Sequence, residues 1–255
     1  IFKFMKLPKR IITTLMLNNG VLFRSKKFIP DYRYTLNFID MYSVDEIILI
    51  DISQKNTFIE NQKKLFLNEL KNLSKNSFVP FSVGGGIRTI KDINFLIQNG
   101  ADRVILNTAA LESPKFIDQA SREFGSQCII ICVDIMRENN KYYVMKNHGK
   151  NKSEYSLENW LQIIQDYNAG EIFLQSIERD GSLIGYDIEL IKYINSYVKI
   201  PIIVSSGAGN WKHIENVFDI DIVSAASLTN VFHFTEKSIS NLKTHLKEKN
   251  FYVRT

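Results

Sequence analysis

Short apolar runs rich in Ile, Val and Leu recur along the chain at roughly regular intervals. Each run has the length and the β-branched composition of a buried strand, and polar or glycine-containing segments separate one run from the next. The runs cover residues 10–17, 46–52, 79–84, 102–107, 128–134, 170–176, 200–205 and 220–226. The pattern therefore predicts eight β-strands.

Amphipathic segments lie between most of these runs. They place apolar residues at three- and four-residue spacing, and several end at glycine, which commonly stops a helix. The predicted helices include residues 89–100, 113–125, 156–170 and 187–197. Repeated strand–helix units in a chain of 255 residues predict an α/β protein with a closed (β/α)8 TIM barrel.

An open doubly wound sheet is the alternative fold. It is less favoured because "VGGGIR" at 83–88 lacks the G-x-G-x-x-G spacing of a dinucleotide-binding turn. No acidic residue follows at the distance that a ribose would require. We expect no bound cofactor.

The chain also resembles itself across its midpoint. "RIITTLML" matches "IIICVDIM", "VPFSVGGGI" matches "IPIIVSSGAG", and "GADRVILNTAAL" matches "FDIDIVSAASL". Self-similarity at a fixed offset indicates an internal repeat. We therefore expect residues 1–255 to form one barrel domain built from two half-barrels, approximately 9–125 and 126–250.

Composition and charge argue against several classes of protein. A net charge of +5 favours acidic ligands, but the lysines are spread over helix-like segments, so nucleic acid is only a weak alternative. The first residues, "IFKFMKLPKR", lack the long apolar run of a signal peptide or a spanning helix. Cys128 and Cys132 lie in one apolar run, and the four histidines show no ligand spacing. These features predict a reduced cytoplasmic protein with no disulfide, no metal site and no membrane contact.

In a TIM barrel the loops after the carboxyl ends of the strands build the active site. Here these loops are rich in small residues: "GGG" at 84–86, "NTAA" at 107–110, "SSGAG" at 205–209 and "SAAS" at 224–227. Backbone N–H groups in such loops and at helix starts can hold phosphate. Tight turns are the alternative explanation, but the symmetric placement favours two anion cradles, suited to a ligand with a phosphate at each end.

Three carboxylates also follow apolar runs: Asp51, Asp134 and Asp180. A carboxylate at the mouth of a barrel can transfer protons, so each is a candidate acid or base. The alternative is that each aspartate caps the following helix or turn.

These motifs together resemble the HisF-type cyclase subunit of imidazole glycerol phosphate synthase. The stretches that carry the resemblance are "KRIITTLMLNNG", "EIILIDIS", "PFSVGGGI", "GADRVILNTAALESP", "VDIMR", "AGEIFLQSIERDGSLIGYD", "PIIVSSGAG" and "AASLTNVFHF". They cover nearly the whole chain in order. The resemblance implies a (β/α)8 barrel that pairs with a class I, HisH-like glutaminase and receives ammonia through its core. In the family, the barrel then cleaves and cyclises a bisphosphorylated ribulosyl intermediate of histidine biosynthesis.

The resemblance assigns the acid–base pair to the ends of the first and fifth strands. Asp134 matches the second aspartate of this pair, whereas the first falls on Met16, which cannot exchange a proton. Thr14 and Gln175 replace a cysteine and a threonine of the family, and Arg24 falls near a lysine of the first loop. Asp51, Asp180 and Arg24 are therefore supporting candidates beside Asp134. The segment "RSKKFIPDYRYTLN" is expected to be a shorter, different first loop.

The remaining functional positions of the family are largely kept. The resemblance implies one phosphate cradle at Gly86, Asn107 and Thr108, and a second at Gly181, Ser205, Gly207, Ala226 and Ser227. It implies an ammonia gate at the starts of alternate strands, formed by Arg10, Glu46, Arg103 and Glu171, and a contact between Asp102 and the glutaminase. Charges at strand starts can also serve solubility, but four that balance in pairs favour a gate.

Three functions stay open at this point. In the first, the chain is a HisF-like paralogue that passes ammonia to a small-molecule acceptor such as a surface-glycan sugar precursor, together with a third synthetase protein. In the second, it is a divergent cyclase of histidine biosynthesis. In the third, it only activates the glutaminase and makes no product of its own.

Overall fold

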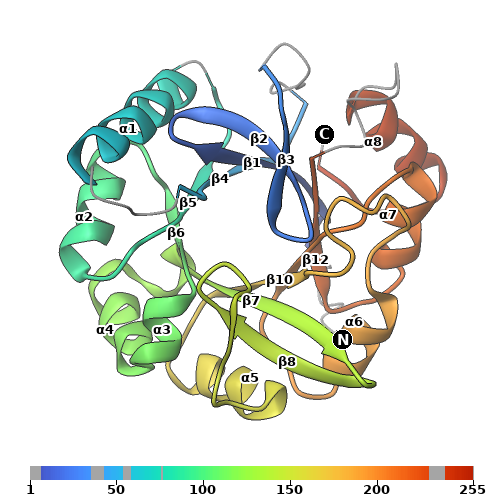
Figure 1. The fold of residues 1–255 in the computed structure, drawn as a ribbon. Helices are drawn as coiled ribbons and strands as arrows, with labels where there is room; N and C mark the ends of the chain where they lie inside the picture. Colours follow the sequence, from blue (N-terminus) through green and yellow to red (C-terminus); the bar gives the residue numbers. More distant parts are fainter. Residues whose placement is uncertain (1–6, 36–42, 54–58, 76, 230–238, 255) are drawn as a thin grey trace, which may run out of the picture.

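Eight parallel strands close into a barrel in the computed structural model, which describes residues 7–35, 43–53, 59–75, 77–229 and 239–254 (Figure 1). In chain order the barrel strands are β1 (Arg10–Asn18), β4 (Glu46–Asp51), β5 (Phe81–Gly84), β6 (Arg103–Leu106), β7 (Ile129–Glu138), β10 (Glu171–Ser176), β11 (Ile202–Ser205) and β12 (Val223–Leu228). Each strand pairs in parallel with the next, β12 pairs with β1, and the β7–β10 pairing completes the ring. The predicted TIM barrel is confirmed.

Helices surround this barrel (Figure 1). They are α1 (Ile59–Lys75), α2 (Ile90–Gln98), α3 (Thr108–Glu112), α4 (Lys115–Phe124), α5 (Leu157–Asp166), α6 (Ile188–Ile194), α7 (Trp211–Phe218) and α8 (Ile239–Glu248). Side-chain caps fix where several begin: Thr89 and Asp92 form a capping box at α2, and Asp187 accepts from the Leu190 N–H at α6. The four helices predicted from the sequence are confirmed, with ends displaced by a few residues.

The barrel interior is packed, because alternate residues of each strand point toward the axis. A core cluster separate from the one under the helices occupies the middle of the barrel: Ile12, Ile48, Ile105, Ile130, Cys132, Phe173, Ile203 and Ala225. Charged residues stand below this layer, where the strands begin, and polar residues stand above it, where they end. The interior therefore has three layers along its axis.

Two hairpins rise from the carboxyl ends of β1 and β7. The first is formed by β2 (Val21–Lys26) and β3 (Ile29–Arg33), and the second by β8 (Lys141–Lys146) and β9 (Asn151–Lys152). Within them Met16 pairs with Phe23, and Asp134 pairs with Met145. Met16 and Asp134 thus each lie in a barrel strand that continues into an antiparallel partner strand.

The expectation that residues 24–37 form a loop is wrong for residues 24–33. The chain reverses at Asn19 and Gly20, whose positive φ angles of 52° and 76° suit a tight hairpin turn. The β-branched and aromatic residues that follow then pair back onto β1 and onto each other. The η2 turn (Ser126–Cys128) is a smaller difference, because it places Cys128 before the strand in which it was expected.

Candidate functional site

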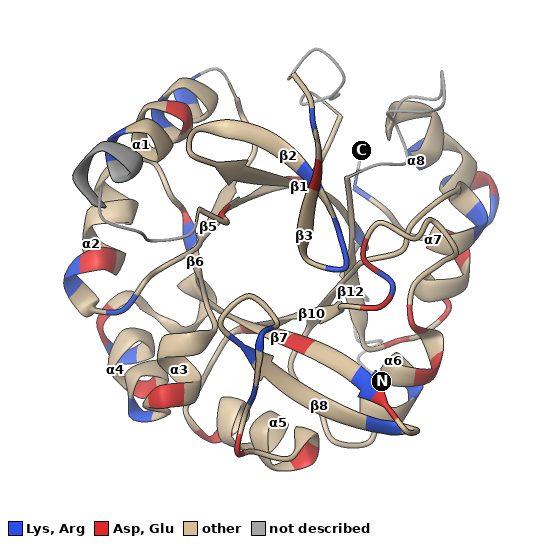
Figure 2. Cartoon of the chain, in the orientation of Figure 1, with Lys and Arg blue, Asp and Glu red and all other residues tan. Residues whose placement is uncertain are grey.

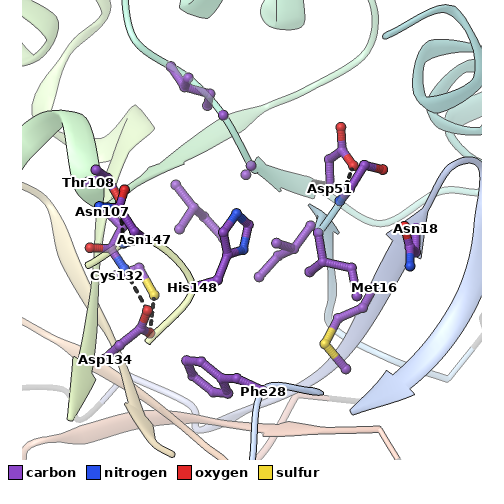
Figure 3. Close-up of a pocket in the computed structure, with 18 of the residues that line it drawn as sticks. Met16, Asn18, Phe28, Asp51, Asn107, Thr108, Cys132, Asp134, Asn147 and His148 are labelled. Carbon is purple, nitrogen blue, oxygen red and sulfur yellow. Dashed lines mark hydrogen bonds between the residues drawn. The ribbon is translucent and has the colours of Figure 1, made fainter. Parts of the chain in front are cut away.

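A cavity of about 580 Å³ opens at the carboxyl ends of the strands (Figure 3). Residues from six barrel strands and from both hairpins line it. They include Met16, Phe28, Asp51, Gly85, Gly86, Asn107, Thr108, Asp134, Asn147, His148 and Gln175. A pocket in this position is the usual place for the active site of a TIM barrel. We call it the main cavity.

Asp134 lies at the base of the main cavity and is almost fully buried, with 4% of its surface exposed. Asn107 Nδ2 donates to its Oδ2 at 2.7 Å, and Gln175 Nε2 donates to its Oδ1 at 3.0 Å. The Cys132 thiol lies 3.1 Å from the same Oδ1. Side chains from three neighbouring strands therefore hold this carboxylate in one orientation.

These surroundings bring the pKa of Asp134 close to neutral pH. Burial opposes ionisation, and although the three donors favour the carboxylate, the pKa of Asp134 rises from 3.8 to about 6. A general acid or base works best when its pKa lies near the operating pH. Asp134 can therefore both accept and donate a proton in this cavity.

The raised pKa has a consequence for stability. A raised carboxyl pKa contributes stability that is fully present below the unfolded-state pKa and is lost as the pH rises through the folded-state pKa. A shift of roughly two units corresponds to about 3 kcal/mol. Between pH 4 and pH 7 we therefore expect the wild type to lose about 3 kcal/mol of unfolding free energy relative to Asp134→Asn.

Denaturant titrations of both proteins at pH 4, 5, 6 and 7 measure this difference. The substitution is accommodated locally, because the buried Oδ1 of Asn107 has no partner among the described residues and can accept from the new amide after a flip. A difference between the two proteins that does not change with pH would contradict the assigned pKa.

Met16 faces the same cavity from β1 (Figure 3). Its sulfur lies 3.5 Å from the Ser25 hydroxyl of the first hairpin. A thioether cannot transfer a proton, so the β1 end of the cavity lacks the group that Asp134 supplies at the β7 end. Thr14, two residues earlier in β1, bonds to Ser227 of the neighbouring strand β12, with 2.6 Å between the two hydroxyl oxygens.

The supporting candidates Asp51, Asp180 and Arg24 lie in different parts of the structure. Asp51 lines the main cavity, and its Oδ1 accepts from the Ser53 N–H at 2.9 Å. Asp180 instead anchors the first hairpin: its Oδ2 accepts from the Ser25 hydroxyl at 2.7 Å and from the Phe28 N–H at 2.9 Å. Arg24 forms an ion pair with Asp31 of the same hairpin, 3.1 Å away. The structure therefore places only Asp51 of the three in the main cavity.

The first predicted phosphate cradle lies in the wall of the main cavity. Gly85 has a φ of 106°, and a Cβ there would lie 2.3 Å from the Asp51 carbonyl oxygen, so only glycine fits. Gly86, Asn107 and Thr108 stand beside it in the same wall. The Thr108 hydroxyl accepts from the Asn147 N–H at 3.0 Å and so ties the second hairpin to the cradle.

The second predicted cradle encloses far less space. Gly181, Ser205, Gly207 and Ser227 line a separate cavity of about 30 Å³, which is enough for about one water molecule. Ala226 does not line it. Ala226 lies on β12, beside Ser227, and pairs with Ile11 and Val204 of the neighbouring strands. We call this space the small cavity.

Several cavity residues have no counterpart in the sequence-based prediction. The sequence assigned no role to the four histidines, which show no ligand spacing, yet His148 lines the main cavity, as Phe28 and Asn147 do (Figure 3). His148 sits at a hairpin turn in which Asn147, His148 and Gly149 all have positive φ. The turn motif "NHG" between two alternating polar–apolar runs is the signal that could have revealed this hairpin.

At the other end of the barrel, the four charges predicted as a gate meet on the axis. Glu46 bonds to Arg10 at 2.8 Å and to Arg103 at 3.2 Å. Glu171 bonds to Arg103 at 2.5 Å and also to Arg10. Signs alternate around a closed ring of four side chains. We call it the charged ring.

The charged ring is buried and fully paired. The side chains of Glu46 and Glu171 are 3% and 4% exposed, and Ser82 and Ser224 donate to them. Burial alone would raise the pKa of Glu171, but the Arg10 and Arg103 guanidinium groups outweigh it and hold that pKa below its usual value. Glu171 is therefore ionised at neutral pH.

Asp102 stands beside this ring at the start of β6. It is exposed, and its Oδ2 accepts from the Phe81 N–H at 2.8 Å. Phe78, fully exposed, lies just before β5 and thus at the same end of the barrel. An exposed carboxylate and an exposed aromatic side chain therefore both stand at this end of the barrel.

The structure gives less support to a metal site, a membrane span or a nucleic-acid surface. No group of metal-ligating side chains occurs among the described residues, and none of their helices is long and apolar enough to cross a membrane. Lys and Arg alternate with Asp and Glu over the outer helices, as Figure 2 shows, instead of forming one basic stripe. This distribution argues against a nucleic-acid surface.

Comparison with known proteins agrees with this architecture. The family model described as "Histidine biosynthesis protein" matches residues 13–238. Three similar proteins, each named imidazole glycerol phosphate synthase subunit HisF, come from Sulfurisphaera tokodaii, Helicobacter hepaticus and Hydrogenobaculum sp.. They are 39%, 37% and 36% identical over 96%, 98% and 97% of this chain, and over 98%, 100% and 99% of their own lengths. The chain therefore belongs to the histidine biosynthesis protein family, within its HisF-type group.

Proposed function

We propose that this chain is the synthase subunit of a glutamine amidotransferase. Ammonia from a partner glutaminase enters where the strands begin, crosses the barrel along its axis, and is added to a phosphorylated acceptor in the main cavity. One observation carries the proposal: the charged ring, the apolar middle layer and the Asp134 cavity are stacked on a single axis. A protein that only needed a stable core would not require charges at one end of the axis and a proton-transfer group at the other.

The middle layer suits neutral ammonia. Its side chains are aliphatic or aromatic except for Cys132, so an ammonium ion would lose its hydration without compensation. Ammonia without charge crosses such a layer at a much lower cost. The charged ring must open for passage, and its two glutamates each hold both arginines, so opening means parting ion pairs on at least one side.

Asp134 supplies proton transfer at the far end. As the ammonia lone pair forms a bond to an electrophilic carbon of the acceptor, the nitrogen gains positive charge and must lose a proton. The Asp134 carboxylate accepts that proton and passes it to the acceptor oxygen. Where that oxygen began as a carbonyl, a second proton follows the same route from nitrogen to oxygen, so that the C–O bond breaks, a C=N bond forms and water leaves. The pKa of about 6 allows both halves of this exchange near neutral pH.

Two ammonia acceptors are candidates for this site. The first is the bisphosphorylated ribulosyl intermediate, which would make the chain a cyclase of histidine biosynthesis; the names and near full-length alignment of the relatives favour it. The second is a sugar precursor of a surface glycan, with a third synthetase protein involved. Met16 favours this second acceptor, because the cavity has no proton-transfer group at the strand-one position.

The test uses the purified chain with its class I glutaminase, supplied with glutamine and the ribulosyl intermediate. Imidazole glycerol phosphate formed at an ordinary enzymatic rate would establish the first acceptor. Glutamine hydrolysis that this chain stimulates, with product below about a hundredth of that rate, would favour the second. If ammonium salts and glutamine give no product with either acceptor, the chain acts only as an activator and the proposal is wrong.

A further inference from the structure

His148 stands at the tip of the second hairpin, which β8 and β9 form. Three consecutive residues there, Asn147, His148 and Gly149, have positive φ angles of 55°, 58° and 76°. Histidine and asparagine tolerate this left-handed backbone better than most side chains do. The turn directs the imidazole inward, and Figure 3 shows it projecting into the main cavity.

Contacts with the barrel and with the first hairpin hold this tip in place. The Asn147 N–H donates to the Thr108 hydroxyl at 3.0 Å, which ties the turn to the start of α3. Gly149 packs against both Ile177 and Phe28. A Cβ added there would lie 3.0 Å from Ile177 Cδ1 and 3.2 Å from Phe28 Cδ2. The imidazole is therefore presented to the cavity from an anchored turn.

The cavity has room in its chemistry for a second proton-transfer group. Asp134 acts at β7, but Met16 at β1 cannot exchange a proton. Asp51 is the other carboxylate among the described lining residues, and its Oδ1 already accepts from the Ser53 N–H. Burial and the neighbouring Asp134 carboxylate hold the pKa of the Cys132 thiol well above its usual value, so this thiol stays protonated. The hairpin imidazole is the remaining side chain of the described lining whose type titrates near neutral pH.

The charged groups around His148 come from the barrel and from its own hairpin. Phe28, which packs on the same tip, carries no charge. The titratable and charged residues of the described lining are Asp51 of β4, Arg88 before α2, Cys132 and Asp134 of β7, and Lys150 of the second hairpin. The two carboxylates favour a protonated imidazole and Lys150 opposes it, while Arg88 is offset by Glu112, with which it pairs at 2.9 Å.

From this placement we infer that His148 is the second proton-transfer residue of the site, a general acid that works with the general base Asp134. The inference rests on the proposed function, because it divides the proton transfer of that reaction between two side chains. It assigns the acid to a hairpin tip, since the end of β1 carries the thioether of Met16.

Protons balance in this division of the reaction. As the C–N bond forms, the nitrogen gives a proton to the Asp134 carboxylate, and the His148 imidazolium gives a proton to the acceptor oxygen. Solvent then carries the proton from Asp134 to the imidazole. Both groups return to their starting states, and one proton has moved from nitrogen to oxygen. Where the oxygen began as a carbonyl, a second cycle breaks the C–O bond, forms the C=N bond and releases water.

Replacing His148 with Asn in the full chain tests this role. Asparagine tolerates a positive φ as histidine does, so the turn should keep its form. The assay supplies saturating free ammonia and the bisphosphorylated ribulosyl intermediate, or the sugar precursor if only that acceptor reacts. We expect kcat to fall by about 10² to 10⁴-fold while KM for the acceptor changes little, because the ring acts on the transition state.

The pH profile gives a second readout. The wild-type rate should decline at high pH as the imidazolium loses its proton, and His148→Asn should lose this alkaline limb. The variant should keep the fall below about pH 6 that protonation of Asp134 causes. His245→Asn, the same change on the outer helix α8, is the matched control and should keep the wild-type rate and profile.

Chemical rescue separates an acid from a structural side chain. His148→Gly removes the ring at a φ of 58°, which glycine adopts readily. Imidazole added to this variant should raise the rate in proportion to its concentration. An unchanged rate and profile in His148→Asn, or a loss in His148→Gly that imidazole does not relieve, would overturn the inference and leave the proposed function standing. If the wild type forms no product with either acceptor, the proposed function is wrong, and the division of proton transfer fails with it.

Discussion

Replacing Asp134 with Asn is expected to lower the rate of ammonia addition by about 10² to 10⁴-fold while the glutaminase still docks and hydrolyses glutamine. The amide keeps the shape of the carboxylate but cannot accept and return a proton. Its partners Asn107 and Gln175 remain in place, so the cavity should keep its form. Steady-state rates with saturating ammonium salt isolate the step that needs Asp134.

The pH dependence of the same assay separates chemistry from positioning. The wild-type rate should fall as the pH drops below about 6, where Asp134 is protonated and cannot act as a base. Asp134→Asn should lose this dependence along with most of the rate. Asp51→Asn is the matched comparison, because Asp51 lines the same cavity with its Oδ1 already bonded to a backbone N–H. Equal losses in the two variants would contradict a special role for Asp134.

Replacing Glu171 with Gln is expected to cost about 3 to 5 kcal/mol of unfolding free energy at pH 7. The charged ring balances two guanidinium groups against two carboxylates, and the substitution leaves one positive charge buried without a counterion. Chemical denaturation measures the loss. Since the pKa of Glu171 is lowered in the folded state, its contribution is present above the unfolded-state pKa of 4.5 and fades as the pH falls below it.

Two controls make this prediction specific. Adding Arg103→Met to Glu171→Gln restores the balance of charge, so the double variant should be more stable than the sum of the single losses predicts. On the surface, Asp118→Asn breaks a pair with Arg122, whose side chain is 80% exposed, and should cost less than about 1 kcal/mol. A loss at Glu171 no larger than that at Asp118 would show that the ring is not a coupled, buried unit.

The sequence predicted most of the fold because strand and helix periods are local. Eight β-branched runs and the amphipathic segments between them needed only their spacing to indicate a barrel. Asn19 and Gly20 are a local turn signal for the first hairpin, but "RSKKFIPDYRYTLN" has no clear alternation, and the pairing of this segment depends on the extension of β1 and on Asp180, which lies 155 positions from Ser25. Hairpins of this kind are decided by contacts that no short window contains.

The residues of the candidate site, like the elements of the fold, were predictable from the sequence only in part. Strand-end position was enough to nominate Asp134, whereas the resemblance to the HisF-type family nominated the Gly86–Asn107–Thr108 cradle and the four charges Arg10, Glu46, Arg103 and Glu171. His148 and Phe28 could not be found in this way, because they reach the cavity from hairpin tips. The small size of the second cradle was equally hidden, since it results from residues of four different strands and of the loops that follow them.

By itself, then, the sequence determined the barrel, the order of its strands, a thioether at Met16 near the end of the first strand and charged residues at the strand starts. These features follow from residue type and spacing, which are properties of the chain alone. The tertiary structure decided that the four charges close into one ring and that burial brings the pKa of Asp134 to about 6. Each of these depends on distance and desolvation between residues far apart in sequence, which only the folded barrel sets.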